Sequence, residues 1–185
     1  MVIAAEGVSI KDVASAISKD SIKDKATKLF KSVSRDFNVS SPRVAILSLN
    51  PEQFGKEENE ILIPVVDELA EAGIQTFGPY SSEAFFGNGY YSDFDAVIAM
   101  YYDQGIPAFK AISTDGIVKF DAGLKLVTVT PDCGTEFDIA GKGVADEAAF
   151  RNSIYTAIDI FRNRANYDDP MHRSEERRVG KECLR

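Results

Sequence analysis

The run RVAILSL at residues 43–49 is the feature that most constrains the fold of this 185-residue chain. It is a short, continuous apolar segment that ends at Asn50-Pro51, a pattern typical of a buried β-strand. A helical pattern follows over about residues 57–72 and stops at Gly73, and another apolar segment begins at Ile74. Strand, helix and strand in this order, over these lengths, predict parallel neighbours in an α/β sheet.

The same alternation continues on both sides of this unit. Further strands are expected at residues 1–5, 74–77, 96–100 and 126–130, and further helices at about 9–18, 21–37 and 147–164. Ser9 and Asp12 form a capping-box-like start for one helix, and Pro64 is expected to kink the helix over 57–72. The predicted fold class is therefore α/β, with a mostly parallel sheet.

Charge and composition exclude several classes of protein. The chain has 21 Lys and Arg against 29 Asp and Glu, a net charge of -8. An acidic body repels phosphate backbones, so we expect no nucleic-acid binding. No apolar run approaches the ~20 residues of a membrane span, so no membrane association is expected. The two cysteines, Cys133 and Cys183, make no disulfide framework, which favours a cytoplasmic protein.

The C-terminal segment differs in character from the rest. Arg173 to Cys183 reads RSEERRVGKEC, which resembles the in-frame translation of a common DNA-sequencing adapter. We therefore expect residues 1–167 to form the folded domain and residues 168–185 to be a disordered, artefactual tail. The only histidine, His172, lies in this tail, so the body has no histidine for a nucleophile pair or a metal site.

Ligands of open α/β sheets collect where strands end, and four loops occupy such places. They are residues 6–9, 50–55, 101–105 and 131–143. The last loop reads PDCGTEFDIAGKG, and its glycines, Gly134, Gly141 and Gly143, allow close approach of the backbone to a ligand. Asp138 could accept hydrogen bonds from a ribose or from the adenine region. The loop therefore favours NAD binding.

Several segments together are similar to the 4-hydroxythreonine-4-phosphate dehydrogenase family. They are GVSIKDV at 7–13, RDFNVSSPRVAILSLNP at 35–51, GKEENEILIP at 55–64, MYYDQG at 100–105, and the loop at 131–143. The resemblance covers nearly all of residues 1–167. It implies an isocitrate/isopropylmalate dehydrogenase-like α/β/α sandwich. This chain would represent the C-terminal half of that fold, with the first half absent.

The resemblance also implies an activity. Members of this family are two-domain homodimers that oxidise 4-phosphooxy-threonine, a small phosphorylated substrate, with NAD on the route to pyridoxal phosphate. The product then loses carbon dioxide. A divalent metal held by three histidines polarises the reacting oxygen.

Carried over residue by residue, the metal site is replaced at each position. The family's three histidines correspond here to Gly7, Glu52 and Tyr102. Glycine offers no side-chain ligand, and a neutral phenol is a poor substitute for an imidazole. We therefore expect the metal to be lost.

The substrate positions are partly kept. Lys110 matches the family's contact to the substrate phosphate, and Asp103 is a possible catalytic residue beside Gln104. A family asparagine and arginine correspond to Lys119 and Thr128.

Three functions stay open at this point. The first is an NAD-dependent dehydrogenase of this family, inactive as this chain alone. The second is a non-catalytic relative that binds a nucleotide or a phosphorylated ligand. The third uses magnesium held by Glu52, Asp103 and Asp132. Two side-chain roles are expected to be structural, with Tyr102 as a packing residue and Cys133 as a small filler.

Overall fold

The computed structural model describes residues 1–52, 55–113 and 116–182, with side chains up to residue 168. The chain forms two compact units. The first comprises residues 1–34 and 40–114, and the second comprises residues 35–39 and 115–185. No helix in the described ranges combines the length and hydrophobicity that crossing a membrane requires.

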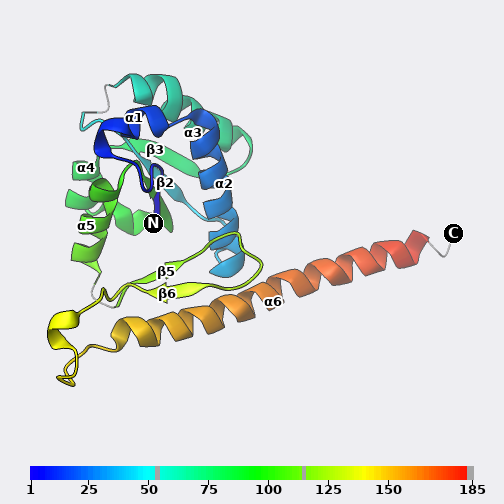
Figure 1. Cartoon of the computed structure of the whole chain (residues 1–185). Helices are drawn as coiled ribbons and strands as arrows, with labels where there is room; N and C mark the ends of the chain where they lie inside the picture. Colours follow the sequence, from blue (N-terminus) through cyan, green and yellow to red (C-terminus); the bar gives the residue numbers. More distant parts are fainter. Residues whose placement is uncertain (53–54, 114–115, 183–185) are drawn as a thin grey trace. The chain divides into compact units, whose positions relative to one another are not determined.

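The first unit is built on a four-stranded parallel sheet (Figure 1). Its strands, in spatial order, are β1 (Val2–Ile3), β4 (Ala96–Ala99), β2 (Val44–Leu47) and β3 (Thr76–Tyr80). Each neighbouring pair is parallel. The predicted α/β class with a mostly parallel sheet is confirmed, although every strand is shorter than, or shifted from, its predicted range.

Helices lie on both sides of this sheet (Figure 1). The α-helices of the first unit are α1 (Val13–Ala16), α2 (Lys19–Asp36, whose last two residues belong to the second unit), α3 (Ile63–Glu71), α4 (Ser82–Gly87) and α5 (Tyr102–Ile112). Three short helical segments join them, η1 (Ile10–Asp12), η2 (Glu58–Leu62) and η3 (Tyr90–Asp93). Helices α2 and α3 lie on one side, and α4 and α5 on the other.

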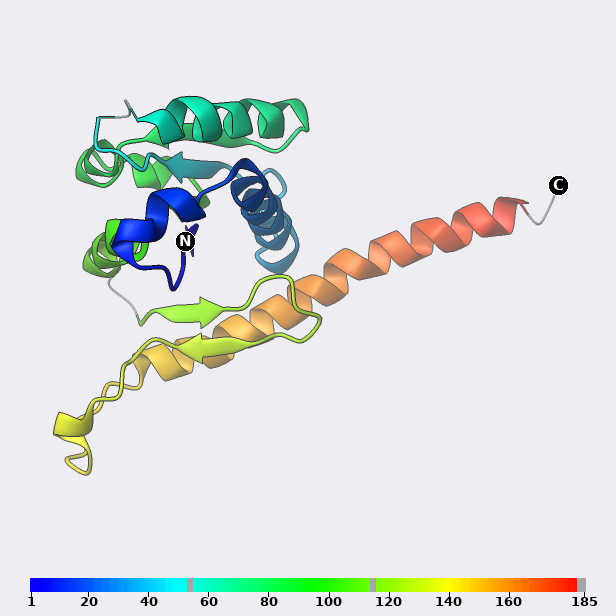
Figure 2. The same ribbon diagram turned by 45° about the horizontal axis from the view of Figure 1, so that its top comes forward.

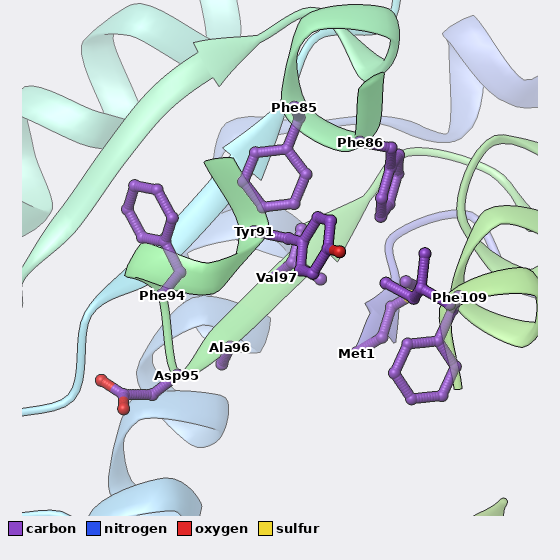
Figure 3. A pocket seen from close by; sticks show the side chains of 10 residues that line it. Met1, Phe85, Phe86, Tyr91, Phe94, Asp95, Ala96, Val97 and Phe109 are labelled. Atoms are coloured by element: carbon purple, nitrogen blue, oxygen red, sulfur yellow. The ribbon is translucent and has the colours of Figure 1, made fainter. Parts of the chain in front are cut away.

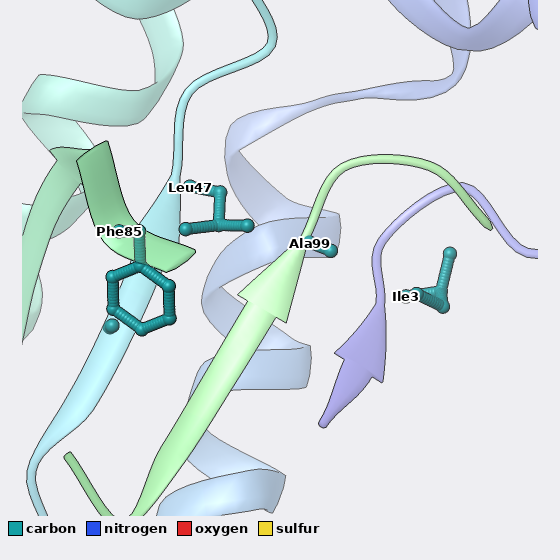
Figure 4. Close-up of a cluster of buried hydrophobic side chains, with 5 residues drawn as sticks. Ile3, Leu47, Phe85 and Ala99 are labelled. Carbon is teal, nitrogen blue, oxygen red and sulfur yellow. The ribbon is translucent and has the colours of Figure 1, made fainter. Parts of the chain in front are cut away.

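Alternating strand residues supply the core on the side of α4 and α5. The buried cluster consists of Ile3, Ala45, Leu47, Phe85 and Ala99 (Figure 4). Phe85 comes from α4 and is fully buried, with Phe86 and Phe94 in contact with it. Because successive strand side chains point to opposite faces, Val44, Ile46 and Ile98 belong to the other side of the sheet.

The long helix α2 follows its predicted pattern. Ile22, Ala26, Leu29 and Val33 are all buried, at the spacing of one helix face. From the same helix, the Lys25 ammonium donates hydrogen bonds to the carbonyls of Ile3 (3.0 Å) and Ala4 (2.7 Å). Lys25 thereby satisfies backbone acceptors where β1 ends.

Two predictions for the beginning of the chain need correction. The expected helix over residues 9–18 is a short helical turn, η1, followed by the single turn α1. Ser9 makes no side-chain cap, whereas Ser18 accepts a hydrogen bond from the Ser21 N–H (3.3 Å) and begins α2. Ser9 and Ser18 both precede a helical pattern in the sequence. Only the packing of the folded chain decides that Ser18, and not Ser9, caps a helix.

The segment predicted as the loop 101–105 is the start of helix α5. Gly105 and Pro107 argue against a helix in the sequence. Gly105, however, lies where a Cβ atom would come within 2.8 Å of the Ala99 side chain. The missing side chain therefore lets α5 lie directly against β4, and close packing outweighs weak helix propensity.

Pro64 is preceded by a widened helical turn, and the kink expected there stays a prediction. It has no N–H to donate to a carbonyl one turn back, and the segment just before it, η2, is a π-helical turn that continues into α3. Helix α3 ends at Glu71, and Gly73 follows with a left-handed φ of 79°, which confirms the predicted stop.

The second unit consists of a hairpin and a long helix. Strands β5 (Val118–Phe120) and β6 (Val129–Pro131) pair antiparallel, η4 (Phe137–Ile139) follows, and α6 spans Ala148–Glu182. Helix α6 runs beside the hairpin (Figure 2). The predicted strand over 126–130 is shifted to β6, and β5 was not predicted, because three residues give too short a pattern to detect.

The predicted end of the last helix at Arg164 is wrong, because α6 continues to Glu182. Asp168, the first residue of the expected tail, accepts hydrogen bonds from the Arg35 guanidinium. Whether residues 168–185 are dispensable stays a prediction. Cys183 and the His172 side chain lie outside the described part of the chain.

One buried ion pair ties the second unit together. Arg164 donates from Nε to the Asp36 carboxylate (2.7 Å), and both side chains are at least nine-tenths buried. Its Nη1 donates to the carbonyls of Leu124 (3.0 Å) and Lys125 (3.2 Å), and its guanidinium lies over the Phe120 ring. One side chain of α6 thus joins the hairpin to residue 36.

Arg164→Met is expected to lower the free energy of unfolding by about 3–5 kcal/mol, because it leaves the Asp36 carboxylate buried without its cation. Urea denaturation measures this loss. Arg162→Met, at an exposed position of the same helix, is the matched control and should stay within about 0.5 kcal/mol of the parent. Equal midpoints for the two variants would contradict the role assigned to the ion pair.

Candidate functional site

Three of the predicted loops meet at the carboxyl edge of the parallel sheet. Gly7 follows β1, Glu52 follows β2, and Tyr102 begins α5 directly after β4. Because β1, β4 and β2 are adjacent and parallel, their ends lie at one edge. The fold therefore gathers the positions that the sequence singled out as one set.

The amide of Gln104 joins the ends of two of these strands. Its Oε1 accepts from the Met100 N–H (2.6 Å), and its Nε2 donates to the Ser48 carbonyl (2.5 Å). Gln104 is buried, so both bonds are shielded from water. The Ser48 N–H in turn donates to the Tyr80 carbonyl (2.7 Å), which extends the connection to β3.

Glu58 fixes the loop after β2. Its carboxylate accepts from the backbone N–H groups of Leu49 (2.7 Å) and Asn50 (2.8 Å), and from Asn50 Nδ2 (2.8 Å). Glu58 is fully buried. Burial alone would raise the pKa of this carboxyl group, but the hydrogen bonds from Asn50 and from the backbone outweigh it and lower the pKa. Glu58 is therefore a buried anion held by donors of the loop.

Gly55 completes this arrangement. A Cβ atom at this position would lie 1.8 Å from Asn50 Nδ2 and 2.1 Å from Glu58 Oε2. Only glycine leaves room for the Asn50–Glu58 contact. The sequence GKEE that begins at Gly55 therefore encodes the shape of this loop.

Replacing Glu58 by glutamine should make stability at neutral pH lower and less dependent on pH. The folded-state pKa of Glu58 is lowered, so its contribution is present above its ordinary pKa of 4.5 and is lost as pH falls through the folded value. At pH 7 the loss should be about 1–3 kcal/mol, since the glutamine NH₂ cannot accept the loop's donors. Denaturation between pH 3 and 7 should show the difference shrink with acid.

Glu71→Gln, at an exposed position of α3, is the control for this experiment. It should follow the parent at every pH. A Glu58→Gln protein with an unchanged acid limb would contradict the assignment.

Gly55→Ala should cost about 1–3 kcal/mol, because the added methyl group forces Asn50 and Glu58 apart. Thermal unfolding measures the effect. Gly87→Ala is the matched control, since a Cβ there meets nothing within 4 Å and its φ is not left-handed. If both alanine variants unfold alike, the loop does not depend on this contact.

The three family metal positions do not fit the metal that the resemblance implies. Gly7 has a left-handed φ of 71° and no side chain to offer, and Tyr102 is 52% exposed. Within the described ranges, no three or more His, Cys, Asp or Glu residues are grouped so that they could hold a metal ion. The predicted packing role of Tyr102 is also wrong, because its ring is largely in solvent.

Asp103 and Lys110 lie at opposite ends of one helix. Asp103 is in the first turn of α5, where a carboxylate interacts favourably with the helix dipole, and Lys110 is in the last. Seven residues correspond to roughly 10 Å along the axis. Lys110 is therefore displaced from the carboxyl edge of the sheet. Its contact with a phosphate stays a prediction.

Lys119 and Thr128 lie on opposite arms of the hairpin of the second unit but are not paired with each other. Lys119, in β5, lies opposite Thr130, and the Thr128 carbonyl accepts from the Asp121 N–H (3.1 Å). The Lys119 ammonium lies 3.0 Å from the Asp132 carboxylate. Because Asp132 is paired with a cation, the structure gives no support to its use as a magnesium ligand.

The loop predicted to bind NAD, residues 131–143, follows β6 of this hairpin. The prediction that it follows a strand of the parallel sheet is wrong, because β6 pairs antiparallel with β5. Gly134, Gly141 and Gly143 have left-handed φ values of 70°, 77° and 66°. Asp138 lies in η4 and is exposed. Cys133 is exposed as well, so its predicted role as a filler is wrong.

A separate cavity of about 130 Å³ lies beside the beginning of β4 (Figure 3). Its walls are mainly aromatic and include Phe85, Tyr91 and Phe109. The carboxylate that lines it, Asp95, already accepts from the Arg43 N–H (2.8 Å). None of the described residues that line the cavity is a lysine or an arginine, and we do not include it in the candidate site.

Comparison with known proteins identifies the family. The family described as "Pyridoxal phosphate biosynthetic protein PdxA" matches residues 1–157. The chain belongs to the PdxA family. The 4-hydroxythreonine-4-phosphate dehydrogenase of Bacteroides thetaiotaomicron is 44% identical over 162 residues, which cover 85% of this chain and 44% of that protein. The enzyme of the same name from Prosthecochloris aestuarii is 40% identical over 143 residues, 75% of this chain and 42% of that protein.

Solved structures agree with this assignment. A putative 4-hydroxythreonine-4-phosphate dehydrogenase from Salmonella typhimurium matches with a TM-score of 0.70 and 30% identity, over 83% of this chain and 48% of that one. A terephthalate 1,2-cis-dihydrodiol dehydrogenase from Burkholderia xenovorans, at 22% identity and a TM-score of 0.55, shares the fold. The chain spans about half the length of the relatives it matches.

Sequence reasoning missed Glu58, although the sequence contains its signal. Glu58 stands four residues before Leu62, and Val65 and Leu69 continue the buried face of this helical segment. A carboxylate on an apolar stripe requires internal donors. Asn50 and the adjoining backbone supply them.

Proposed function

We propose that this chain is the nucleotide-binding part of a 4-hydroxythreonine-4-phosphate dehydrogenase-type protein and does not turn over substrate by itself. The proposed ligands are NAD and a small phosphorylated substrate. Family membership supports the class of reaction, in which a hydroxyl group is oxidised in pyridoxal phosphate synthesis.

The nucleotide loop carries the proposal. Its three glycines adopt left-handed backbone conformations, which favour glycine over other residues, and all three are exposed, so a ligand could approach the backbone closely. Asp138 is exposed within the same loop and can accept hydrogen bonds from ribose hydroxyls. Phe137 beside it is 81% exposed and offers an apolar surface to a planar ring.

The replaced metal positions support the absence of turnover. Gly7, Glu52 and Tyr102 do not supply the imidazole set of the family, so no group of this chain is assigned to polarise the substrate hydroxyl. A non-catalytic relative that binds a nucleotide or a phosphorylated ligand is the second candidate. The same observation favours it.

The finer features of the fold belong to this proposal as well. We infer an isocitrate/isopropylmalate dehydrogenase-like α/β/α sandwich completed by sequence that this chain does not contain. A cytoplasmic location follows from the absence of a disulfide framework.

Calorimetry with NAD tests the proposal. Binding should be weak, with a Kd on the order of 0.1 to 1 mM, or about -4 to -5.5 kcal/mol. Asp138→Ala should abolish it, because the carboxylate acceptor is lost. Asp159→Ala, at an exposed position of α6 outside the loop, is the control and should bind like the parent.

Binding that ignores Asp138→Ala would place the nucleotide elsewhere. NADH production from 4-phosphooxy-threonine by the chain alone, at rates of about 1 to 10 per second, would contradict the absence of turnover. NAD binding without turnover agrees with both candidate functions, and turnover by a protein completed with the missing half separates them.

A further inference from the structure

Asn88 and Gly89 form the joint between two helical segments of the first unit. Helix α4 ends at Gly87, and η3 begins at Tyr90. No other asparagine in the sequence is followed by a glycine, and Asn88 is exposed. A Cβ atom at Gly89 would meet nothing within 4 Å, so the space beside the peptide bond that joins the two residues is open.

These two residue types can react with each other. The side-chain amide carbon of an asparagine lies close to the nitrogen of the next peptide bond, and attack by that nitrogen closes a cyclic imide. Glycine favours the attack, because it has no side chain to obstruct the approach and adopts more backbone conformations than other residues. The nitrogen attacks after it loses its proton, so the rate rises with pH.

The folded turn opposes this attack only weakly. Asn88 has a ψ of 2° and must rotate to bring the two atoms together, which opens the bond from the Gly89 N–H to the Phe86 carbonyl. That bond is 3.3 Å long, against about 3.0 Å for an ordinary one, and it closes the end of a short helix, where turns open readily. Among the described residues, none holds the Asn88 side chain by a hydrogen bond.

We propose that Asn88 is a site of spontaneous deamidation, with water as the co-reactant. The Gly89 nitrogen forms a bond to Cγ of Asn88, and the Cγ–Nδ2 bond breaks, so that ammonia leaves with the proton of the attacking nitrogen. Water then adds to one of the two ring carbonyls and breaks the bond from that carbonyl to the nitrogen. Opening at Cγ gives aspartate, whereas opening at the backbone carbonyl gives isoaspartate. No group is oxidised or reduced.

The modification changes the link between two walls of the aromatic cavity. Phe85 and Phe86 come from α4 and Tyr91 from η3, and all three line that cavity (Figure 3). The rings of Phe86 and Tyr91 are in contact across the joint, with centroids 6.4 Å apart. In isoaspartate the backbone runs through Cγ and is longer by a methylene carbon, which separates α4 from η3. This consequence does not depend on the proposed nucleotide binding.

Peptide mapping by mass spectrometry tests the proposal on the whole chain. Purified protein is kept at mildly alkaline pH, and samples are taken over several weeks. The peptide with residue 88 should gain the mass difference between an amide and an acid, as a mixture of aspartate and isoaspartate. The rate at Asn88 should exceed that at exposed Asn59 by at least about tenfold, because a glutamate follows Asn59 and its amide donates to the Gly55 carbonyl (2.9 Å).

Asn88→Gln is the matched control. It keeps an amide at the same position, but its longer side chain would have to close a larger ring, so it should stay unmodified over the same period. The aged parent should melt at a lower temperature than the fresh parent, whereas the aged Asn88→Gln protein should not. Asn88→Asp adds the charge without lengthening the backbone and should melt above the isoaspartate fraction of the aged parent. Equal melting of the two would overturn the role given to the longer link.

Three results would overturn the proposal itself. The first is an equal rate at Asn88 and Asn59, or no reaction at Asn88. The second is aspartate without isoaspartate, because direct hydrolysis of the side chain gives aspartate alone. The third is reaction in a urea-denatured sample but not in the folded protein, which would show that the bond from Gly89 to Phe86 blocks the attack.

Discussion

The amide of Gln104 is the interaction on which the candidate site depends. It connects the Met100 N–H after β4 with the Ser48 carbonyl after β2, at distances of 2.6 and 2.5 Å. Parallel strands are not joined by a tight turn that would align their ends, so side chains must hold those ends in place. Glu58 adds a second connection by holding the backbone of Leu49 and Asn50. Together they fix where the loops leave the sheet.

This frame does not depend on the metal that the family resemblance implies. The resemblance predicts histidines at Gly7, Glu52 and Tyr102, whereas the frame is held by Gly55, which makes room for the contact between Asn50 and Glu58. A buried carboxylate with three donors contributes to stability whether or not a ligand binds nearby. Stability therefore explains the frame without invoking catalysis.

The second unit has a two-stranded hairpin, which is only marginally stable by itself, and one helix. Arg164 compensates by reaching Asp36, Leu124 and Lys125 from α6. The loop at residues 131–143, which we propose to bind a nucleotide, extends from this hairpin with little burial.

The sequence by itself determined the fold class, the long helix α2 and the family. Two sequence patterns allow only one interpretation of secondary structure, because local periodicity and burial agree. They are the apolar run VAIL at 44–47 and the stripe of Ile22, Ala26, Leu29 and Val33. The family followed from motifs that stay together along the chain, and the match over residues 1–157 confirms it.

Only the tertiary structure decided what depends on contacts between distant residues. Residues 101–105 read as a loop, but close packing of Gly105 on Ala99 makes them helical. The sequence did not single out Glu58 or Arg164. The fold buries them and supplies their partners, Leu49 and Asn50 for Glu58 and Asp36 for Arg164. Local sequence patterns reflect only the interactions of a residue with its neighbours along the chain. The partner that compensates a buried charge is fixed only when the chain folds.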